Sequence, residues 1–221
     1  MIKFFTFIFA YTLPICALAA EFKVTDALGN PASGIAVYLI PDDEAKFKDL
    51  WANHADTIDT RTIISQKNKK FAPYLAITST KNPIVFDNKD DITHHIYSVD
   101  KDNSFDFKLR SGEQKLDIAF AEQTTIAMGC NIHDWMAGHL LVVDTPFYAI
   151  TDIDGKVVFS ELPDLDLKLK LYHPQLSKAD NENEISVILT NNEFVVELTE
   201  PLRTPPQQQD PSEFDFVEGY E

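Results

Sequence analysis

Residues 124–143 read TTIAMGCNIHDWMAGHLLVV, two apolar runs separated by a more polar loop. The runs at 124–128 and 139–143 are short and rich in threonine, isoleucine, leucine and valine, a composition typical of β-strands. The segment between them contains two glycines, an asparagine and an aspartate, which favour turns and loops. This stretch therefore predicts two strands joined by a short loop.

The same alternation of apolar runs and turn residues continues outward along the chain. Asp87-Asn88, Ser111-Gly112 and Asp154-Gly155 are among the turn signals between the runs. Many short strands at this spacing predict an all-β protein built from sandwiches or barrels. The candidate strands are FKVTD, GIAVYLI, RTIIS, PYLAIT, NPIVF, HHIYSV, SFDFKL, KLDIAF, TTIAM, HLLVV, FYAITD, KVVFS, LKLKLYH, EISVIL and EFVVEL.

Two segments depart from the strand pattern. Residues 42–56, DDEAKFKDLWANHAD, carry apolar side chains at helical spacing and predict a helix or an irregular cover. Residues 201–221 are rich in proline, glutamine and acidic residues, and we expect disorder because they have little to bury. Phe214, Phe216 and Tyr220 leave a short docking motif open as an alternative to an idle tail.

The N-terminus has the form of an export signal. Residues 1–19 contain a lysine, then an apolar stretch, and end in Ala17-Leu18-Ala19, which is typical of a cleavable signal peptide. The apolar stretch is too short and too poorly flanked for a lasting membrane span. We therefore expect a periplasmic protein with no integral membrane segment in its mature form. Cys16 lies within the signal, so Cys130 is the cysteine that the mature chain keeps.

The charge of the chain restricts its partners. It has 35 acidic and 19 basic residues, with a formal net charge of −16. This excess of negative charge argues against nucleic acid, whose phosphates require lysine and arginine. It fits a soluble protein, and it would favour encounter with a basic partner.

The loop between the two strands carries three potential metal ligands. Cys130, His133 and Met136 follow one another at three-residue steps. A thiolate, an imidazole and a thioether are three of the four ligands of a blue copper site. The fourth ligand is a second imidazole. A candidate for that ligand lies in DDITHHIYSV, where His94 and His95 follow an Asp/Asn-rich turn. Neighbouring residues of a strand point to opposite faces, so only one of the two can face a metal.

Other interpretations of this loop stay open. Cys130 can be a buried, inert cysteine, since free cysteine packs as a small hydrophobe. A nucleophilic Cys130–His133 pair oriented by Asp134 is also conceivable, although the sequence shows no oxyanion signature. A zinc site with His94, Cys130, His133 and a further donor is a third option, which leaves the methionine unexplained.

Residues 60–144 resemble a cupredoxin, the small β-sandwich that holds type 1 copper. Cupredoxins typically take one histidine from a His-Asn pair after a turn, and the other ligands from a Cys-x-x-His-x(n)-Met loop. The loop here is similar to the compact loop of amicyanin. The resemblance implies a Greek-key sandwich with one copper ion per chain. The implied ligands are His94, Cys130, His133 and Met136.

The resemblance also implies roles around the ligands. His95 stands where cupredoxins usually have asparagine, and it stays open as the alternative ligand. With His94 as the ligand, His95 points away and its backbone N–H donates to the Cys130 sulfur, which raises the reduction potential. Asn131 and Asp134 are the other candidates for outer-shell or alternative roles.

Electron transfer is expected to run through the loop. The resemblance implies that His133 has a solvent-facing edge. Trp135 and Ala137, with Met136, would form an apolar contact surface around it.

The wider chain, with GCNIHDWM and HHIYS, is similar to bacterial periplasmic proteins of the methylamine-utilisation and plastocyanin-like family. Its flanks, 22–41 and 147–174, resemble the two ends of a carboxypeptidase-regulatory-like, immunoglobulin-type sandwich. The predicted domains are therefore a discontinuous regulatory-like sandwich, 20–45 with 146–200, and a cupredoxin domain at 60–145.

From this resemblance we expect a periplasmic type 1 copper protein that carries single electrons and is not an enzyme. A c-type cytochrome or a periplasmic dehydrogenase is the expected partner. A copper oxidase or reductase needs a second metal site, and the sequence has no further histidine-rich cluster. The alternatives are a copper storage or delivery protein, and a non-redox binding module with a structural metal site.

Overall fold

The computed structural model describes residues 18–41, 61–80, 82–98, 100, 103–162, 166–176, 182–187, 193–199 and 202–203. These residues form sixteen strands and contain no helix. The strands are β1 (Leu18–Thr25), β2 (Ala36–Pro41), β3 (Thr62–Lys67), β4 (Lys70–Ala72), β5 (Leu75–Ser79), β6 (Ile84–Asn88), β7 (His94–Ser98), β8 (Phe105–Leu109), β9 (Gln114–Ile118), β10 (Thr124–Cys130), β11 (Ala137–Val143), β12 (Tyr148–Ile150), β13 (Lys156–Leu162), β14 (Leu167–Tyr172), β15 (Glu182–Val187) and β16 (Glu193–Glu197).

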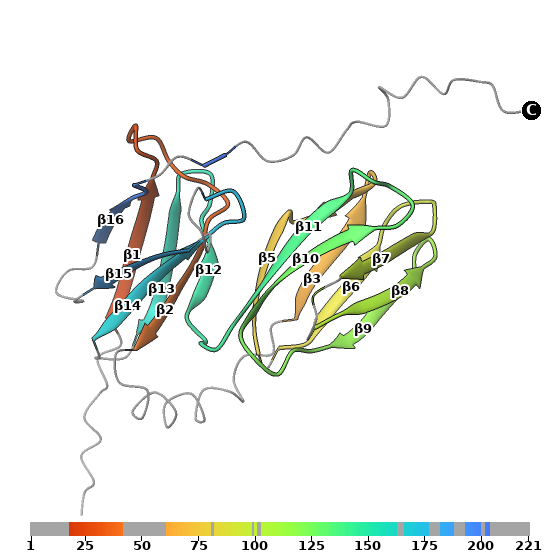
Figure 1. Ribbon diagram of the computed structural model, residues 1–221. Coiled ribbons are helices and arrows are strands. Elements are labelled where there is room, and N and C mark those ends of the chain that lie inside the picture. The colour runs from red at the N-terminus through yellow and green to blue at the C-terminus, as the bar shows by residue number, and fades with distance from the viewer. Residues whose placement is uncertain are drawn as a thin grey trace, which may run out of the picture.

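Four sheets form two sandwiches that lie side by side (Figure 1). The first sandwich consists of the sheets β13-β1-β16 and β12-β2-β14-β15. The second sandwich consists of the sheets β4-β3-β6-β9 and β5-β11-β10-β7-β8. The chain thus leaves the first sandwich after β2, builds the second with β3–β11, and returns for β12–β16. The predicted all-β fold with two combined sandwiches is confirmed.

Several predicted features fall outside the described residues. They include the helix at 42–56, residues 1–17 of the signal peptide, and residues 204–221 of the tail. Strand β1 begins at Leu18, so cleavage after Ala19 would leave the strand from Ala20 onward. The signal peptide and the residue boundaries of the domains stay predictions.

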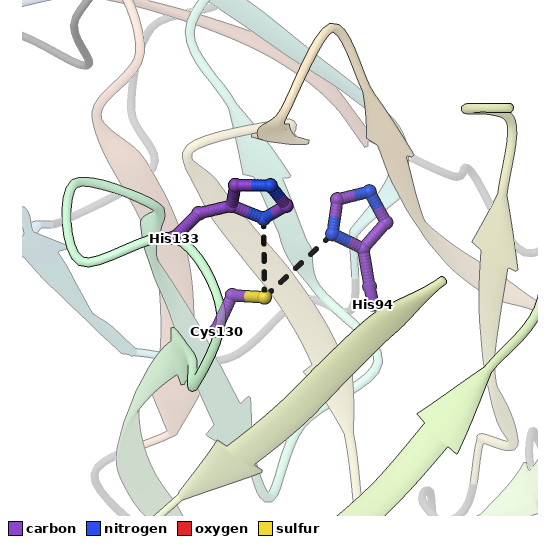
Figure 2. Close-up of side chains that lie close together, drawn as sticks. All are labelled: His94, Cys130 and His133. Atoms are coloured by element: carbon purple, nitrogen blue, oxygen red, sulfur yellow. Dashed lines mark hydrogen bonds between the residues drawn. The ribbon is translucent and has the colours of Figure 1, made fainter. Parts of the chain in front are cut away.

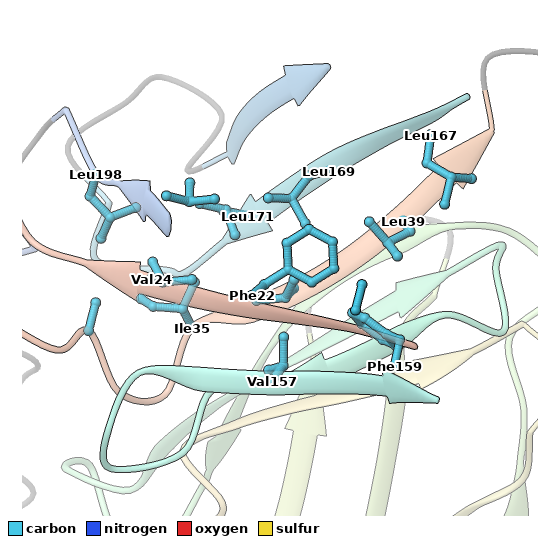
Figure 3. Close-up of a cluster of buried hydrophobic side chains, with 14 of the residues drawn as sticks. Phe22, Val24, Ile35, Leu39, Val157, Phe159, Leu167, Leu169, Leu171 and Leu198 are labelled. Atoms are coloured by element: carbon cyan, nitrogen blue, oxygen red, sulfur yellow. The ribbon is translucent and has the colours of Figure 1, made fainter. Parts of the chain in front are cut away.

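The core of the first sandwich is built from alternating residues of strands such as β1. On β1, Phe22 and Val24 have no exposed surface, and Lys23 between them faces outward. Phe22 stacks on Phe194 with ring centroids 5.0 Å apart and meets Phe159 edge-on at 5.9 Å. Figure 3 shows Phe22 and Phe159 of this sheet with Leu39, Leu169 and Leu171 of the opposite sheet in one apolar cluster. Alternation of this kind fixes the register of each strand, because a slip of one residue would expose the apolar face.

The two sandwiches share an apolar interface. Strands β2 and β11 are buried on both faces, which their continuous apolar runs AVYLI and HLLVV allow. On β2, Val37 and Leu39 belong to the core of the first sandwich, while Tyr38 packs toward the second. On β11, Leu141 packs toward the first sandwich. Because β11 begins directly after the loop with the potential ligands, this interface supports the end of that loop.

A polar cluster borders the same interface. Tyr74 meets the His139 ring at 5.2 Å and the His173 ring at 6.4 Å. The Gln175 side-chain amide donates to the Tyr74 hydroxyl at 3.0 Å. His173 is 7% exposed, and burial together with the nearby His139 lowers its pKa from 6.5 to about 4.

We expect His173 to make the protein less stable in mild acid. Above pH 6.5, His173 is neutral in both the folded and the unfolded chain, so its titration does not change the stability. Between pH 6.5 and about 4 the unfolded chain binds a proton that the folded chain rejects, so stability falls as the pH falls. The loss should reach about 1–2 kcal/mol at pH 5. Urea unfolding at pH 7 and pH 5 measures it.

The matched variant for this prediction is His173→Gln. The His173 Nδ1 accepts a hydrogen bond from the Gln175 backbone N–H at 3.1 Å, and a glutamine oxygen can accept it too. The variant should lose less stability between pH 7 and pH 5 than the natural chain, by the same amount of about 1–2 kcal/mol. Parallel losses in both proteins would show that His173 does not titrate in this way.

One strand was missed in the sequence. Strand β4 has only three residues, Lys-Phe-Ala, and no apolar alternation. It forms because Asn68 and Lys69 adopt left-handed conformations, with φ of 54° and 55°, and fold the chain back on β3. Two positive φ values fit the tight hairpin turns that match strand twist, and asparagine tolerates that conformation well. A two-residue turn is a weak signal when lysines flank it.

Candidate metal centre

The end of β10 and the start of β7 lie next to each other in one sheet. Cys130, the last residue of β10, is opposite Ile96 of β7, and His94 is the first residue of β7. Residues opposite each other in an antiparallel pair share a face, and so do residues two apart on a strand. His94, Ile96 and Cys130 therefore all point into the second sandwich, where Cys130 and Ile96 belong to the core.

The loop after β10 brings His133 to the same place. The Met136 backbone N–H donates to the His133 carbonyl at 2.9 Å, and the Cys130 N–H donates to the Met136 carbonyl at 3.2 Å. These bonds fold residues 131–136 into a compact loop. Figure 2 shows the outcome: both imidazole rings turn their Nδ1 atoms toward the Cys130 sulfur.

The geometry of the three donors fits a metal ion. The Cys130 Sγ lies 3.6 Å from the His94 Nδ1 and 3.5 Å from the His133 Nδ1, and all three atoms lie within 4.8 Å of one another. A metal–sulfur bond of about 2.3 Å and a metal–nitrogen bond of about 2.0 Å place two shared donors roughly 3.5 Å apart. The residues present therefore suit an ion held by two imidazoles and one thiolate, all three of them buried.

The surroundings favour the thiolate form of Cys130. Burial alone would raise the pKa of the thiol. Hydrogen bonds from the His94 ring and from the backbone N–H groups of Ile132, His95 and His133 outweigh burial and lower the pKa. The thiolate is the form that binds metal, so these hydrogen bonds favour the ligand form of the side chain. The His95 N–H is one of these donors, and its effect on a reduction potential stays a prediction.

A carboxylate holds the His94 ring from behind. The His94 Nε2 donates to the Asp90 Oδ2 at 2.7 Å, and the ring has no exposed surface. Burial alone would lower the pKa of His94, but the hydrogen bonds with Cys130 and Asp90 raise it. The same carboxylate accepts the backbone N–H groups of Asn68 and Lys69. Metal-bound histidines commonly donate their second nitrogen to such a group, which fixes the ring.

His133 is the histidine of the pair that reaches the surface. It is 8% exposed, whereas His94 is fully buried. Burial, together with the positive charges of His94 and Lys69, lowers the pKa of His133 and keeps the imidazole neutral. Its ring packs against Trp135, with centroids 5.3 Å apart. Of the three donor residues, His133 therefore has the largest exposed fraction.

The other predicted residues occupy distinct places. Met136 is 1% exposed and lies in the same core cluster as Cys130, and its assignment as axial ligand stays a prediction. His95 points to the outer face, where its Nε2 bonds Asp106 at 2.6 Å and its Nδ1 contacts Asn131 at 3.3 Å. His95 is therefore not brought together with the other donors.

Asp134 is exposed on the loop. Trp135 and Ala137, predicted to form the contact surface, are both half-buried beside it. Two neighbours of the site were not identified from the sequence. Asp90 lay within an Asp/Asn-rich turn with no signal to separate it from its neighbours. Ile132 is 55% exposed next to His133, and an isoleucine in a loop gives no indication of which way it points.

Comparison with known proteins yields partial structural likenesses. No protein-family description and no curated protein sequence matches the chain. Among solved structures, a copper-containing nitrite reductase from Thermus scotoductus SA-01 is similar over 39% of this chain, with 20% identity and a TM-score of 0.36. The matched part spans only 23% of that enzyme.

Two smaller copper proteins show a likeness of the same extent. A purple cupredoxin from Nitrosopumilus maritimus aligns over its whole length with 38% of this chain, at 22% identity and a TM-score of 0.33. A point variant of amicyanin in its Cu(I) form aligns over 89% of its length with 40% of this chain, at 13% identity and a TM-score of 0.35. At these values the likenesses carry no argument, so the strand order and the donor geometry carry the functional interpretation.

Proposed function

We propose that this protein is an exported electron carrier with one type 1 copper ion, which His94, Cys130 and His133 would hold together with Met136 as a weak fourth ligand. One observation carries the proposal: a buried cysteine sulfur and two imidazole nitrogens converge within 4.8 Å from two strand ends and one loop. A thiolate and two imidazoles bind either copper or zinc, and the thioether of Met136 favours copper because methionine is a poor zinc ligand. Bound copper would supply the redox chemistry by changing between Cu(II) and Cu(I).

The chain would contribute rigidity. His94 is fixed by Asp90 at 2.7 Å, and Cys130 lies in the core at 3% exposure. Donors held in this way would move little when the charge of the ion changes, which favours fast electron transfer. The 8% exposed edge of His133 would be the route to a partner. Redox partners usually meet through small interfaces, and Ile132 and Trp135 beside this edge would supply apolar contact.

The remaining predictions join this proposal. The signal sequence supports a periplasmic location, and no helix long and apolar enough to cross a membrane occurs within the part of the chain that the structure describes. A c-type cytochrome or a periplasmic dehydrogenase is the proposed partner. The protein would carry electrons without catalysing a reaction of its own.

We expect the mature protein to become intensely coloured with one equivalent of Cu(II), through thiolate-to-copper charge transfer. His94→Ala should lose or strongly weaken this band, because it removes one donor of the cluster. The matched variant His95→Ala should keep it, because His95 faces Asp106 and Asn131 instead. Visible absorption spectra of the three proteins test the assignment.

Reversibility separates the functional alternatives. An electron carrier should be bleached by a mild reductant and recover its colour with an oxidant over repeated cycles. Rapid loss of copper to a competing chelator, with a poorly reversible couple, would indicate storage or delivery instead. A colourless copper complex, or a band that survives His94→Ala but not His95→Ala, would contradict the proposed ligand set.

A further inference from the structure

The acidic residues of this chain are unevenly distributed. Residues 60–86 contain none of the 35 acidic residues of the protein. The same stretch contains five basic residues: Arg61, Lys67, Lys69, Lys70 and Lys81. Three of these lysines lie at the turn between β3 and β4, which we call the lysine hairpin (residues 67–71). The lysine hairpin is thus locally basic within a chain that has a net charge of −16.

The lysine hairpin is attached to the candidate metal centre. The backbone N–H groups of Asn68 and Lys69 donate to the Asp90 carboxylate that also holds the His94 ring. On the other side, Phe71 packs against Gly138, where a Cβ atom would approach the phenylalanine to 3.0 Å. The charge of Lys69 also acts on His133. The hairpin therefore flanks the exposed edge through which electrons would pass.

The charges of the hairpin are not neutralised within the described residues. Lys67 and Lys70 are opposite each other in the β3–β4 ladder. Two positive charges at directly opposite positions repel each other and do not neutralise each other. Among the described residues, no carboxylate forms an ion pair with Lys67, Lys69 or Lys70. The positive field is therefore available to a partner.

Nearby carboxylates only partly offset this field. Asp87 pairs with Lys89 at 3.4 Å, and Asp90 is engaged by His94 and two backbone N–H groups. Asp91 is exposed at the rim, and Asp134 is exposed on the ligand loop. The three lysines of the hairpin thus outnumber by one the two carboxylates, Asp90 and Asp91, that line the same pocket.

The hairpin also forms a concave surface. An open pocket of about 550 Å³ is lined by residues 67–72 of the hairpin and its end, together with Asp90 and Asp91. Concave positive surfaces concentrate anions more effectively than flat ones. At physiological salt the Debye length is about 8 Å, so a docked partner responds to these lysines more than to distant negative charges.

We propose that the lysine hairpin is the docking site for an acidic surface of the redox partner. This inference rests on the proposed electron-carrier function, and it reverses the expectation of a basic partner that the overall charge suggests. Charge complementarity would bring the partner to the side of the molecule where His133, 8% exposed, lies nearest the surface, and Ile132 beside it would add apolar contact. The lysines would set orientation and encounter rate, while His133 would carry the electron.

The test uses hexacyanochromate(III), a paramagnetic and redox-inert anion that broadens the NMR signals of nearby amides. We expect selective broadening of the amides of residues 67–71 and of Asp91 in the full mature chain, loaded with Cu(I). The double variant Lys67→Glu/Lys70→Glu should weaken binding of the anion about fivefold or more. The matched variant Lys108→Glu/Lys115→Glu changes the net charge of the protein by the same amount, at exposed sites on β8 and β9. It should change the affinity for the anion by less than about twofold.

Further measurements separate the outcomes. A glutamate-rich peptide should displace the anion, and failure to do so would restrict the site to small anions and overturn the proposal. Broadening elsewhere, or an equal effect of both double variants, would overturn it too. If the hairpin amides shift when Glu213→Gln/Asp215→Asn neutralises part of the acidic tail, the chain's own tail covers the site and the partner proposal fails.

The same experiment on metal-free protein distinguishes this proposal from the proposed function. Anion binding at the hairpin requires no copper, so the broadening should persist. A protein that forms the coloured copper complex but shows no broadening at the hairpin would refute the docking site. A colourless copper complex with intact broadening would refute only the electron carrier.

Discussion

Replacing Cys130 with serine is expected to abolish the visible absorption of the copper-loaded protein. The band arises from charge transfer between the thiolate and Cu(II). A serine hydroxyl does not ionise near neutral pH, so it cannot replace the thiolate. The sulfur is also the atom that both imidazole nitrogens face, at 3.6 and 3.5 Å. Copper affinity should fall by more than the roughly 10–100-fold that loss of an outer-shell partner costs.

The fold should survive this substitution. Serine preserves the Cβ position and nearly the volume of cysteine, and the backbone bonds between Cys130 and Met136 do not involve the side chain. Circular dichroism before and after the change provides the control. A Cys130→Ser protein that keeps an intense band would place the copper site elsewhere. The His139 and His173 cluster at the interface would then be the next site to examine.

Truncation of Phe22 to alanine is expected to have the largest effect on stability, a loss of about 3–5 kcal/mol. Phe22 has no exposed surface and contacts aromatic rings from two other strands, Phe159 and Phe194. The cavity left behind would lie at the centre of the first sandwich, where neighbouring strands cannot collapse into it. Urea unfolding followed by far-ultraviolet circular dichroism measures the change.

Val195→Ala is the matched control for Phe22→Ala. Val195 lies on β16, which pairs with β1, but its side chain is 74% exposed. Its truncation should change stability by no more than about 0.5 kcal/mol. Similar losses for the two variants would show that Phe22 is not packed as described.

Phe22→Ala also tests whether the two sandwiches unfold together. They share an apolar interface that includes Tyr38, Leu141 and Tyr172. Large hydrophobic interfaces couple domains, so the copper band of the second sandwich should disappear in the same urea transition as the circular dichroism signal. Two separate transitions would show that the interface contributes little to the stability of the metal centre.

The sequence by itself determined the local features of this protein. Period-two alternation predicted the strands, and the run of residues around Cys130 predicted a strand, a loop and a strand. The three-residue step from Cys130 to His133 already implied that one short stretch of the chain supplies two donors, which the structure places at the end of β10 and in the loop after it. Alternation also required that His94 and His95 face opposite ways. All of these depend on neighbours in the sequence, so local composition is sufficient to predict them.

Tertiary structure decided the features that depend on pairing between distant strands. The pairing of Cys130 with Ile96 turns His94 inward and His95 outward, and no local pattern contains that register. The Asp90 carboxylate and the lysine hairpin join the site through contacts between separate turns. The interface uses faces of β2 and β11 that a single strand cannot assign. Period two specifies that a strand has two faces, and only its partners decide what each face meets.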